Sequence, residues 1–137
     1  MADPSLLLDS DVLIDFFRGS PQAADWLSTN RDAVIGIPVI VLMELLQGAR
    51  SAAEQGSIGK QLEAFSVQHL ETGDSQRALE WFATYRLSHG TGIMDCLMGA
   101  IAARLSVPFY TFNVRHFGPI AGVHARQPYE RPEVTTT

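Results

Sequence analysis

The sequence predicts an α/β fold in which helices cover both faces of a central parallel sheet. Short apolar runs, typical of strands buried on both faces, alternate with longer stretches of helical periodicity. The chain has 137 residues, of which 46% are hydrophobic, and this suffices for one sizeable core. We therefore expect a single domain over residues 1–126, followed by a flexible polar tail at 127–137 that proline residues interrupt.

The first half of the chain begins with a buried strand, the run LLL at 6–8, which leads directly into a helix. Ser10 or Asp11 is the expected cap of this helix, which ends near Gly19. A short helix after Pro21 precedes a second strand, VIGI at 34–37. Pro38 then starts a long helix over 38–56, whose first half is almost wholly apolar and is therefore expected to be buried.

The second half repeats this alternation. A helical segment near 57–65 precedes a short strand at 66–70 and a one-faced helix capped by Asp74. The next helix, GIMDCLMGAIAARLSVP, carries small residues that permit close packing, and it ends at Pro108. The segments PFYTFN and AGVHA (121–125) are predicted to complete the sheet as its last two strands.

Three acidic residues lie in apolar surroundings. Asp9 directly follows the first strand, at the carboxyl edge where open α/β sheets place their ligands. Glu44 is the only charge within IPVIVLMELL, and Asp95 is the only one from 87 to 103 when histidine is counted as neutral. Buried carboxylates need hydrogen-bond donors, an arginine, a cation or a proton. Because oxygen ligands suit hard divalent cations, these three acids predict a metal site.

Each acid also has a purely structural interpretation. Asp9 can cap the helix that follows it, and Asp95 can interact with the dipole of its own helix. Glu44 can form a buried ion pair with Arg86 or Arg104. These alternatives remain open at the level of the sequence.

Further polar residues surround the predicted site. Asp11 is expected to be a helix cap or a surface acid, and Asp15 to lie on the polar face of its helix. Asn113 follows the late strand and so reaches the same edge, where it either holds a water or a carboxylate in place or forms an ordinary turn. His116 is expected to face solvent or pack against neighbours, with phosphate binding and proton transfer as alternatives.

The composition limits the function. A net charge of −5 disfavours nucleic-acid binding by overall charge, since such binding depends on lysine and arginine at phosphates. Lys60 is the only lysine, so nearly all positive charge is arginine, which suits bidentate phosphate contacts. Cys96 is the only cysteine and is expected to be a small buried residue in a reducing compartment. With no apolar run long enough for a bilayer, we expect a soluble, cytoplasmic protein.

The motifs together resemble the PIN-domain family over roughly residues 5–120. LLLDSDVLIDFFRG is similar to the family's opening strand and helix, and VLMELLQGAR to its second motif, an acid within an apolar helix followed by a glycine. IMDCLMGAIAARLSVPFYTFNVRHF resembles the third and fourth motifs, an aspartate on a small-residue helix that leads to a strand and a Thr-x-Asn turn. The resemblance implies a three-layer α/β/α PIN-like domain.

The resemblance also implies an activity. It implies an endoribonuclease, usually Mg²⁺- or Mn²⁺-dependent and commonly the toxin of a VapBC pair, which a VapB-like antitoxin holds inactive and which is often homodimeric. It places Asp9, Glu44 and Asp95 at the three acid positions as metal-binding and catalytic residues, with Asn113 as a neutral catalytic helper. The substrate is then RNA, the cofactor is Mg²⁺ or Mn²⁺, and no membrane is involved.

The fourth acid position departs from the family. Many relatives have an acid in the turn after the late strand, whereas this chain has no Asp or Glu from 96 to 129 and offers Asn113 and His116 instead. We therefore expect one tightly bound metal rather than two. The predicted reaction is hydrolysis of an RNA phosphodiester by a metal-activated water, with Arg18, Arg86 or Arg115 at phosphate oxygens.

Two other functions remain open. A catalytically weak PIN-like module that only binds a partner or RNA would account for the missing fourth acid. LLLDSDVL also resembles the Asp-x-Asp strand end of haloacid-dehalogenase-like phosphatases, with Asp9 as nucleophile, Asp11 as acid and Thr111 as phosphate ligand. That family then needs a lysine and an acidic pair downstream, but the only lysine here lies upstream, at position 60.

Overall fold

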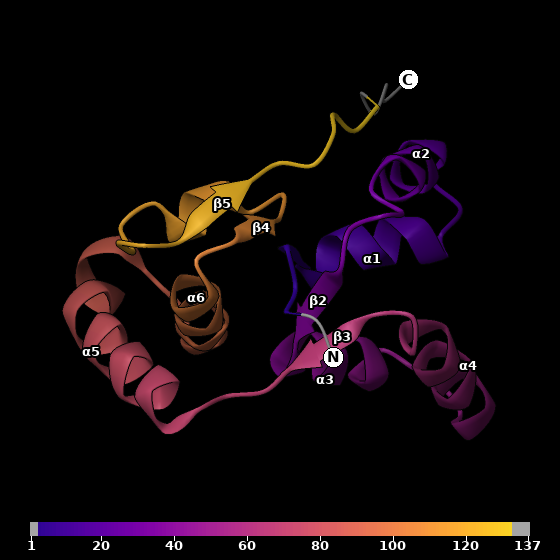
Figure 1. Ribbon diagram of the computed structural model, residues 1–137. Coiled ribbons are helices and arrows are strands. Elements are labelled where there is room, and N and C mark those ends of the chain that lie inside the picture. Colours follow the sequence, from indigo (N-terminus) through magenta and orange to yellow (C-terminus); the bar gives the residue numbers. More distant parts are fainter. Residues whose placement is uncertain (1–2, 133–137) are drawn as a thin grey trace, which may run out of the picture.

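A five-stranded parallel sheet forms the centre of the molecule in the computed structural model, which describes residues 3–132 (Figure 1). The strand order is β3-β2-β1-β4-β5, and every neighbouring pair is parallel. The strands are β1 (Leu6–Leu8), β2 (Ile35–Pro38), β3 (Ser66–Gln68), β4 (Pro108–Tyr110) and β5 (His124–Arg126). The predicted α/β architecture with a central parallel sheet is confirmed.

Helices lie on both faces of this sheet. In the view of Figure 1, α5 and α6 lie to its left and α1, α2 and α4 to its right. The helices are α1 (Ser10–Phe17), α2 (Pro21–Thr29), α3 (Val39–Gln47), α4 (Ala52–Leu62), α5 (Thr72–His89), α6 (Ile93–Leu105) and the short 3-10 helix η1 (Val114–Phe117).

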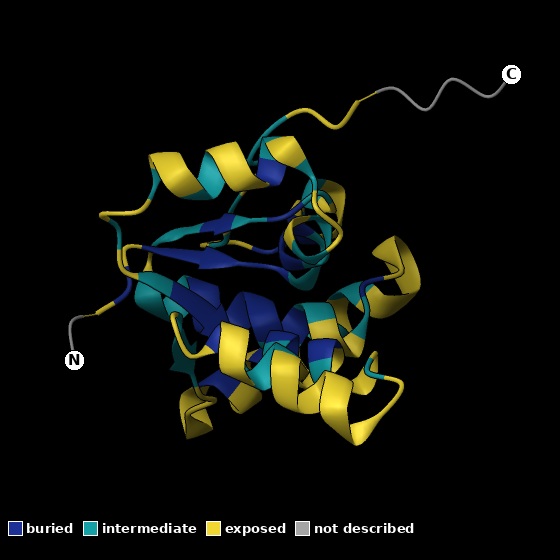
Figure 2. Cartoon of the chain, turned by 90° about the vertical axis from the view of Figure 1, so that its right-hand side faces the viewer, coloured by how far each residue is buried: buried dark blue, intermediate teal, exposed yellow. Residues whose placement is uncertain are grey.

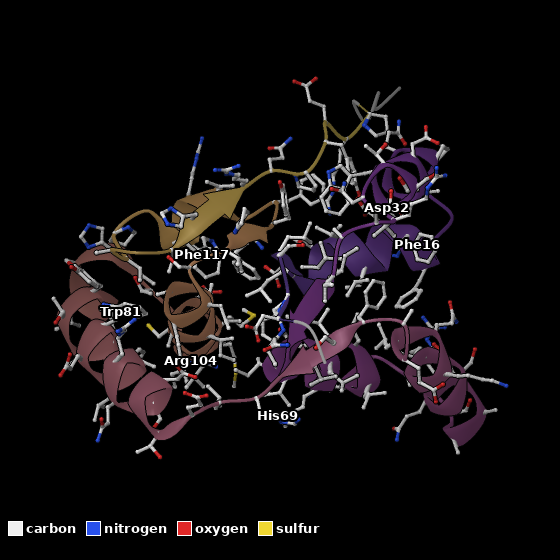
Figure 3. The ribbon with its side chains drawn as sticks, in the orientation of Figure 1. Phe16, Asp32, His69, Trp81, Arg104 and Phe117 are labelled. Atoms are coloured by element: carbon white, nitrogen blue, oxygen red, sulfur yellow. The ribbon has the colours of Figure 1, made fainter. Side chains whose placement is uncertain are left out.

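The core follows from the apolar runs of the sequence. The three residues of β1 are all buried, and the central strands are dark blue between the helices in Figure 2. Phe109 of β4 is fully buried, and its ring packs edge-to-face on that of Phe117, with centroids 5.1 Å apart (Figure 3). Cys96 is a buried free thiol, as predicted.

The order of the strands creates a switch point between β1 and β4. The chain passes from β1 to β2 and β3 on one side of the sheet, then crosses over to β4 on the other side of β1. At such a point the connections leave the sheet in opposite directions and open a crevice at the carboxyl ends of the strands. The residues directly after β1 and β4 therefore lie next to one another.

The long helix predicted over 38–56 is two helices. Gly48 is the C-cap of α3, and the chain turns before Ser51, whose side chain accepts a hydrogen bond from Glu54 N at 3.1 Å and so caps α4. The prediction was wrong because it passed over two local signals, Gly48 as a helix end and the Ser-x-x-Glu capping pattern that starts a new helix after Ser51.

Asp74 is not the cap of α5. Glu71 holds the N-cap position, and Asp74 lies in the first turn, where it accepts a hydrogen bond from Glu71 N at 2.9 Å. The buried carboxylate of Asp74 also receives Arg104 Nε from α6, at 3.0 and 3.1 Å (Figure 3). This ion pair holds the start of α5 against α6. Because Arg104 binds Asp74, it does not form the predicted ion pair with Glu44.

The segment after β5 makes specific contacts with α1 and with the turn after β4. Tyr129 Oη donates to Asp15 Oδ2 at 2.8 Å, and Arg131 Nε lies 3.0 Å from the same oxygen. The Arg131 guanidinium also stacks 3.7 Å from the centre of the Phe112 ring. Asp15 is therefore half-buried and paired rather than a free polar-face acid. The domain boundary at 126 stays a prediction, and residues 133–137 of the expected tail lie outside the described residues.

None of the helices within residues 3–132 combines the length and the apolar character that a bilayer crossing requires.

Gly36 in β2 tests how tightly the sheet is packed. A methyl group there would lie 2.8 Å from Leu7 Cδ2 and 2.9 Å from Pro4 Cβ, which is too close for carbon atoms. We expect Gly36→Ala to lower the free energy of unfolding by about 1–3 kcal/mol in urea denaturation. The control, Gly56→Ala, meets no described atom within 4 Å in α4 and should raise it by about 1 kcal/mol. Equal midpoints for the two variants would contradict this packing.

The contacts of Arg131 predict that the segment after β5 contributes to stability. Arg131→Ala removes the ion pair with Asp15 and the stacking on Phe112, and we expect a loss of about 1 kcal/mol in the same measurement. Arg31→Ala, at an exposed arginine beyond α2, is the matched control and should change little. An unchanged midpoint for Arg131→Ala would show that these contacts do not persist in solution.

Candidate metal and active site

Asp9 lies at the carboxyl end of β1, where it is also the N-cap of α1. Its side chain is buried, with Oδ1 accepting from Ser10 N at 2.7 Å and Oδ2 accepting from Thr111 Oγ1 at 2.8 Å. The cap is therefore Asp9, and the assignment to Ser10 or Asp11 was wrong. Capping and a role in the site are compatible here, because the two oxygens face different partners.

Asp11 is a site residue that the sequence analysis assigned to the cap or the surface. Its Oδ2 accepts from Phe112 N at 2.9 Å and lies 3.4 Å from Asn113 Nδ2. Its Oδ1 is buried and has no hydrogen-bond partner among the described residues. Burial, and secondarily the charge of Asp9, raise the pKa of Asp11 to about 6. A buried oxygen without a donor is an unsatisfied ligand that a cation can complete.

Thr111 joins the two strand ends. It is fully buried directly after β4, and its hydroxyl lies 2.8 Å from Asp9 Oδ2 and 3.4 Å from Asp11 Oδ2. Its oxygen also accepts from Asn113 N at 3.0 Å, which shapes the turn into η1. The Thr-x-Asn spacing after an apolar strand was the signal for this role. Asn113 itself is exposed, with its amide toward Asp11.

Asp95 reaches the site from the first turn of α6. Burial raises the pKa of Asp95, the nearby imidazole of His116 lowers it, and Asp9 raises it. Asp95 Oδ2 lies 3.3 Å from His116 Nδ1. His116 is exposed, as expected, but its ring also pairs with Asp95, which the sequence did not predict.

Glu44 is exposed, so its prediction as a buried carboxylate was wrong. It lies on the exposed face of α3 together with Met43 and Gln47, whereas the apolar residues Ile40, Val41 and Leu45 are buried. Neither predicted ion pair forms within residues 3–132, where Arg86 has no salt bridge and Arg104 binds Asp74. The pKa of Glu44 is nevertheless raised, by partial burial and then by Asp9, Asp95 and Asp11. Glu44 therefore belongs to the same acidic cluster.

Four carboxylates, Asp9, Asp11, Glu44 and Asp95, thus influence one another at one edge of the sheet. Within residues 3–132, no three Asp, Glu, His or Cys side chains converge as closely as in a preformed metal cage. Mg²⁺ does not require such a cage, because it retains several waters and uses one or two carboxylates together with substrate phosphate. The all-oxygen donor set and the unsatisfied Asp11 Oδ1 fit such an ion.

Comparisons with known proteins agree with this arrangement. The PIN domain family matches residues 6–121. Ribonuclease VapC10 of Mycobacterium tuberculosis is 38% identical over 114 residues, which cover 82% of this chain and 85% of that protein. Ribonuclease VapC19 of the same organism is 36% identical over 118 residues, covering 81% of this chain and 90% of that protein.

A solved structure shares the fold. A toxin–antitoxin complex from Klebsiella pneumoniae contains a chain that superposes with a TM-score of 0.76 at 25% identity. The superposition covers 93% of this chain and all of that one, 100%. The three-layer arrangement of helices around the sheet is therefore shared over nearly the whole length.

The raised pKa of Asp11 predicts the pH dependence of stability without metal. Between about pH 4 and pH 6 the folded protein holds a proton that the unfolded chain has released, so folding stability falls as pH rises through this range. Asp11→Asn removes the effect, and we expect its melting temperature to exceed the wild-type value increasingly from pH 4 to pH 7 in chelator. Asp25→Asn, at an exposed acid of α2, should show no such trend.

Saturating Mn²⁺ at pH 7 should reverse that order. We expect it to raise the melting temperature of the wild type by about 3–10 °C and that of Asp11→Asn by less. Equal shifts in both proteins would exclude Asp11 from the metal site.

Proposed function

The chain belongs to the PIN-domain family, and from this premise we propose that it is a Mg²⁺- or Mn²⁺-dependent endoribonuclease and the toxin of a toxin–antitoxin pair. The observation that carries the proposal is the meeting of Asp9, Asp11 and Asp95 at the switch point of a parallel sheet, with one buried carboxylate oxygen left unpaired. Such a cluster repels itself unless a cation is bound, which argues for a functional rather than a structural role.

The residues divide the work by position. When bound, a divalent ion supplies Lewis acidity toward a phosphate oxygen and lowers the pKa of water. Asp9 and Asp95, together with Asp11, hold that ion directly or through water. Asn113 keeps Asp11 oriented through its amide. We expect one tightly bound ion, since the turn after β4 offers Asn113 and His116 in place of an acid.

Glu44 is the residue that we propose as the general base for the attacking water. Its exposed carboxylate orients the water and accepts its proton while the water oxygen attacks phosphorus and the ester P–O bond breaks. The pKa of Glu44 is raised by partial burial and by the three aspartates, which makes its carboxylate a stronger base. Its exposure suits this role, because a group that handles solvent and RNA must be open to both.

The partners follow from the relatives. VapC10 and VapC19 are ribonucleases by name, and the Klebsiella structure is a toxin–antitoxin complex. We extend these properties to this chain as RNA substrate, a VapB-like antitoxin and a homodimer. The cytoplasm, where RNA and antitoxin are both present, is the proposed location.

Cleavage of labelled RNA in Mg²⁺ or Mn²⁺ tests the proposal. We expect cuts that a chelator abolishes, with the rate lowered about 100-fold or more in Asp9→Asn and Asp95→Asn through loss of metal binding. Glu44→Gln should lower the rate by about 100- to 10,000-fold through loss of the base. Glu80→Gln, at an exposed acid of α5, is the control and should cleave normally.

The outcomes separate the alternatives. Cleavage that survives in Asp9→Asn or in chelator would exclude this site. RNA or antitoxin binding without any cleavage by the wild type would favour the catalytically weak binding module.

A further inference from the structure

A cleft of about 180 Å³ lies beside the acidic cluster, between the turn that joins α5 to α6 and η1. In Figure 1 this turn lies next to the loop that leads into β5. None of the lining residues is acidic, although the chain carries a net charge of −5. The lining consists of His89, Gly90, Thr91, Arg115, His116 and Pro119.

The basic side chains of this cleft are available to a ligand. Arg115 and His89 are both exposed, and neither forms a salt bridge with any residue in the described part of the chain. His89 Nδ1 lies 2.7 Å from Ser88 Oγ, which leaves its Nε2 free. A guanidinium and an imidazole that face one small cleft without a carboxylate partner favour an anion there.

Thr91 is a neutral polar side chain in the lining of the cleft. Only 6% of the residue's surface is exposed, and its hydroxyl forms no hydrogen bond with another group among residues 3–132. Gly90 positions it, because the left-handed backbone of this residue (φ 65°) ends α5 and turns the chain into the cleft. Because Thr91 lines the cleft and its oxygen is not fully enclosed, water or a phosphate oxygen can reach its hydroxyl.

The start of α6 adds favourable backbone polarity. Gly92 is the N-cap of this 13-residue helix, and no side chain caps its first N–H groups. The N-terminal end of a helix carries partial positive charge and attracts phosphate. Thr91 directly precedes this cap, so the lining of the cleft leads into the helix terminus.

His116 connects the cleft to the acidic cluster. Its ring lines the cleft, and its Nδ1 lies 3.3 Å from Asp95 Oδ2. The imidazole therefore contacts a carboxylate of the acidic cluster, which suits a cation, and also lines the basic cleft, which suits an anion. We infer that this cleft binds a backbone phosphate of the RNA strand, next to the phosphate that lies at Asp9 and Asp95.

This inference rests on the proposed ribonuclease function for its choice of RNA, while the phosphate site itself does not. A phosphate held beside the carboxylates fixes the register of the strand without reading its bases. The residues that do so are Arg115, His89 and Thr91, none of which belongs to the acidic cluster. They are positioning residues for the scissile bond.

Inorganic phosphate tests the site apart from catalysis. In ¹⁵N-labelled protein kept free of divalent metal by a chelator, phosphate should shift the amide signals of Thr91 and Gly92. Arg115→Gln should lose most of this shift, and Thr91→Val should weaken it without a change of charge. Arg31→Gln, at an exposed arginine beyond α2, should respond like the wild type.

RNA binding tests the inference in the Asp9→Asn background, where the strand stays intact. With fluorescent single-stranded RNA, we expect Arg115→Gln to weaken binding about five- to tenfold and Arg31→Gln to change it less than twofold. The slope of log K against log salt should fall by about 0.7 in Arg115→Gln, as expected for one lost phosphate contact on a single strand.

The two measurements separate the two hypotheses. Phosphate shifts at Thr91 and Gly92 without RNA cleavage by the wild type would support the site while the proposed function fails. RNA cleavage with no such shifts, and with equal slopes for Arg115→Gln and Arg31→Gln, would overturn the site while the proposed function stands. Equal losses in both arginine variants would also overturn it, since they would indicate uniform electrostatic attraction.

Discussion

The hydrogen bond from Thr111 to Asp9 joins the carboxyl ends of β1 and β4, and the arrangement of the site depends on it. The two strands are neighbours only because the chain crosses over at β1, so this bond exists only in the folded sheet. The same threonine shapes the turn that brings Phe112 N and the Asn113 amide to Asp11. One buried hydroxyl thus sets the positions of two carboxylates and of the loop that supports them.

Holding these carboxylates together is unfavourable in the protein alone. Burial and mutual repulsion raise the pKa of Asp11, Glu44 and Asp95, so each prefers a proton or a nearby cation. The burial of apolar side chains in the core around β1 and β4 compensates for this unfavourable free energy. A bound divalent ion would reduce the repulsion further. The acidic edge is therefore organised for a ligand rather than for stability, as functional sites often are.

Charge is separated over a short distance at this edge. His116 contacts Asp95 of the acidic cluster and also lines the cleft that contains Arg115 and His89. This arrangement suits an RNA strand, because a metal ion at the carboxylates and the basic side chains of the cleft would neutralise neighbouring phosphates. An overall charge of −5 is compatible with such binding, since the local distribution rather than the sum acts on the strand.

The parallel α/β class, the position of Asp9 at a strand end and that of Asp95 at a helix start could be predicted from the sequence, because apolar periodicity and position along an element are local properties. Which side chains meet depends on how the elements pack in three dimensions. The tertiary structure placed Asp11 against the turn after β4, paired His116 with Asp95 and bound Arg131 to Asp15. Glu44 shows the limit most clearly, since its apolar neighbours predicted burial while the packing of α3 left its outer face open. Local pattern indicates that a face is apolar, but whether another element covers that face depends on contacts between residues far apart in the chain.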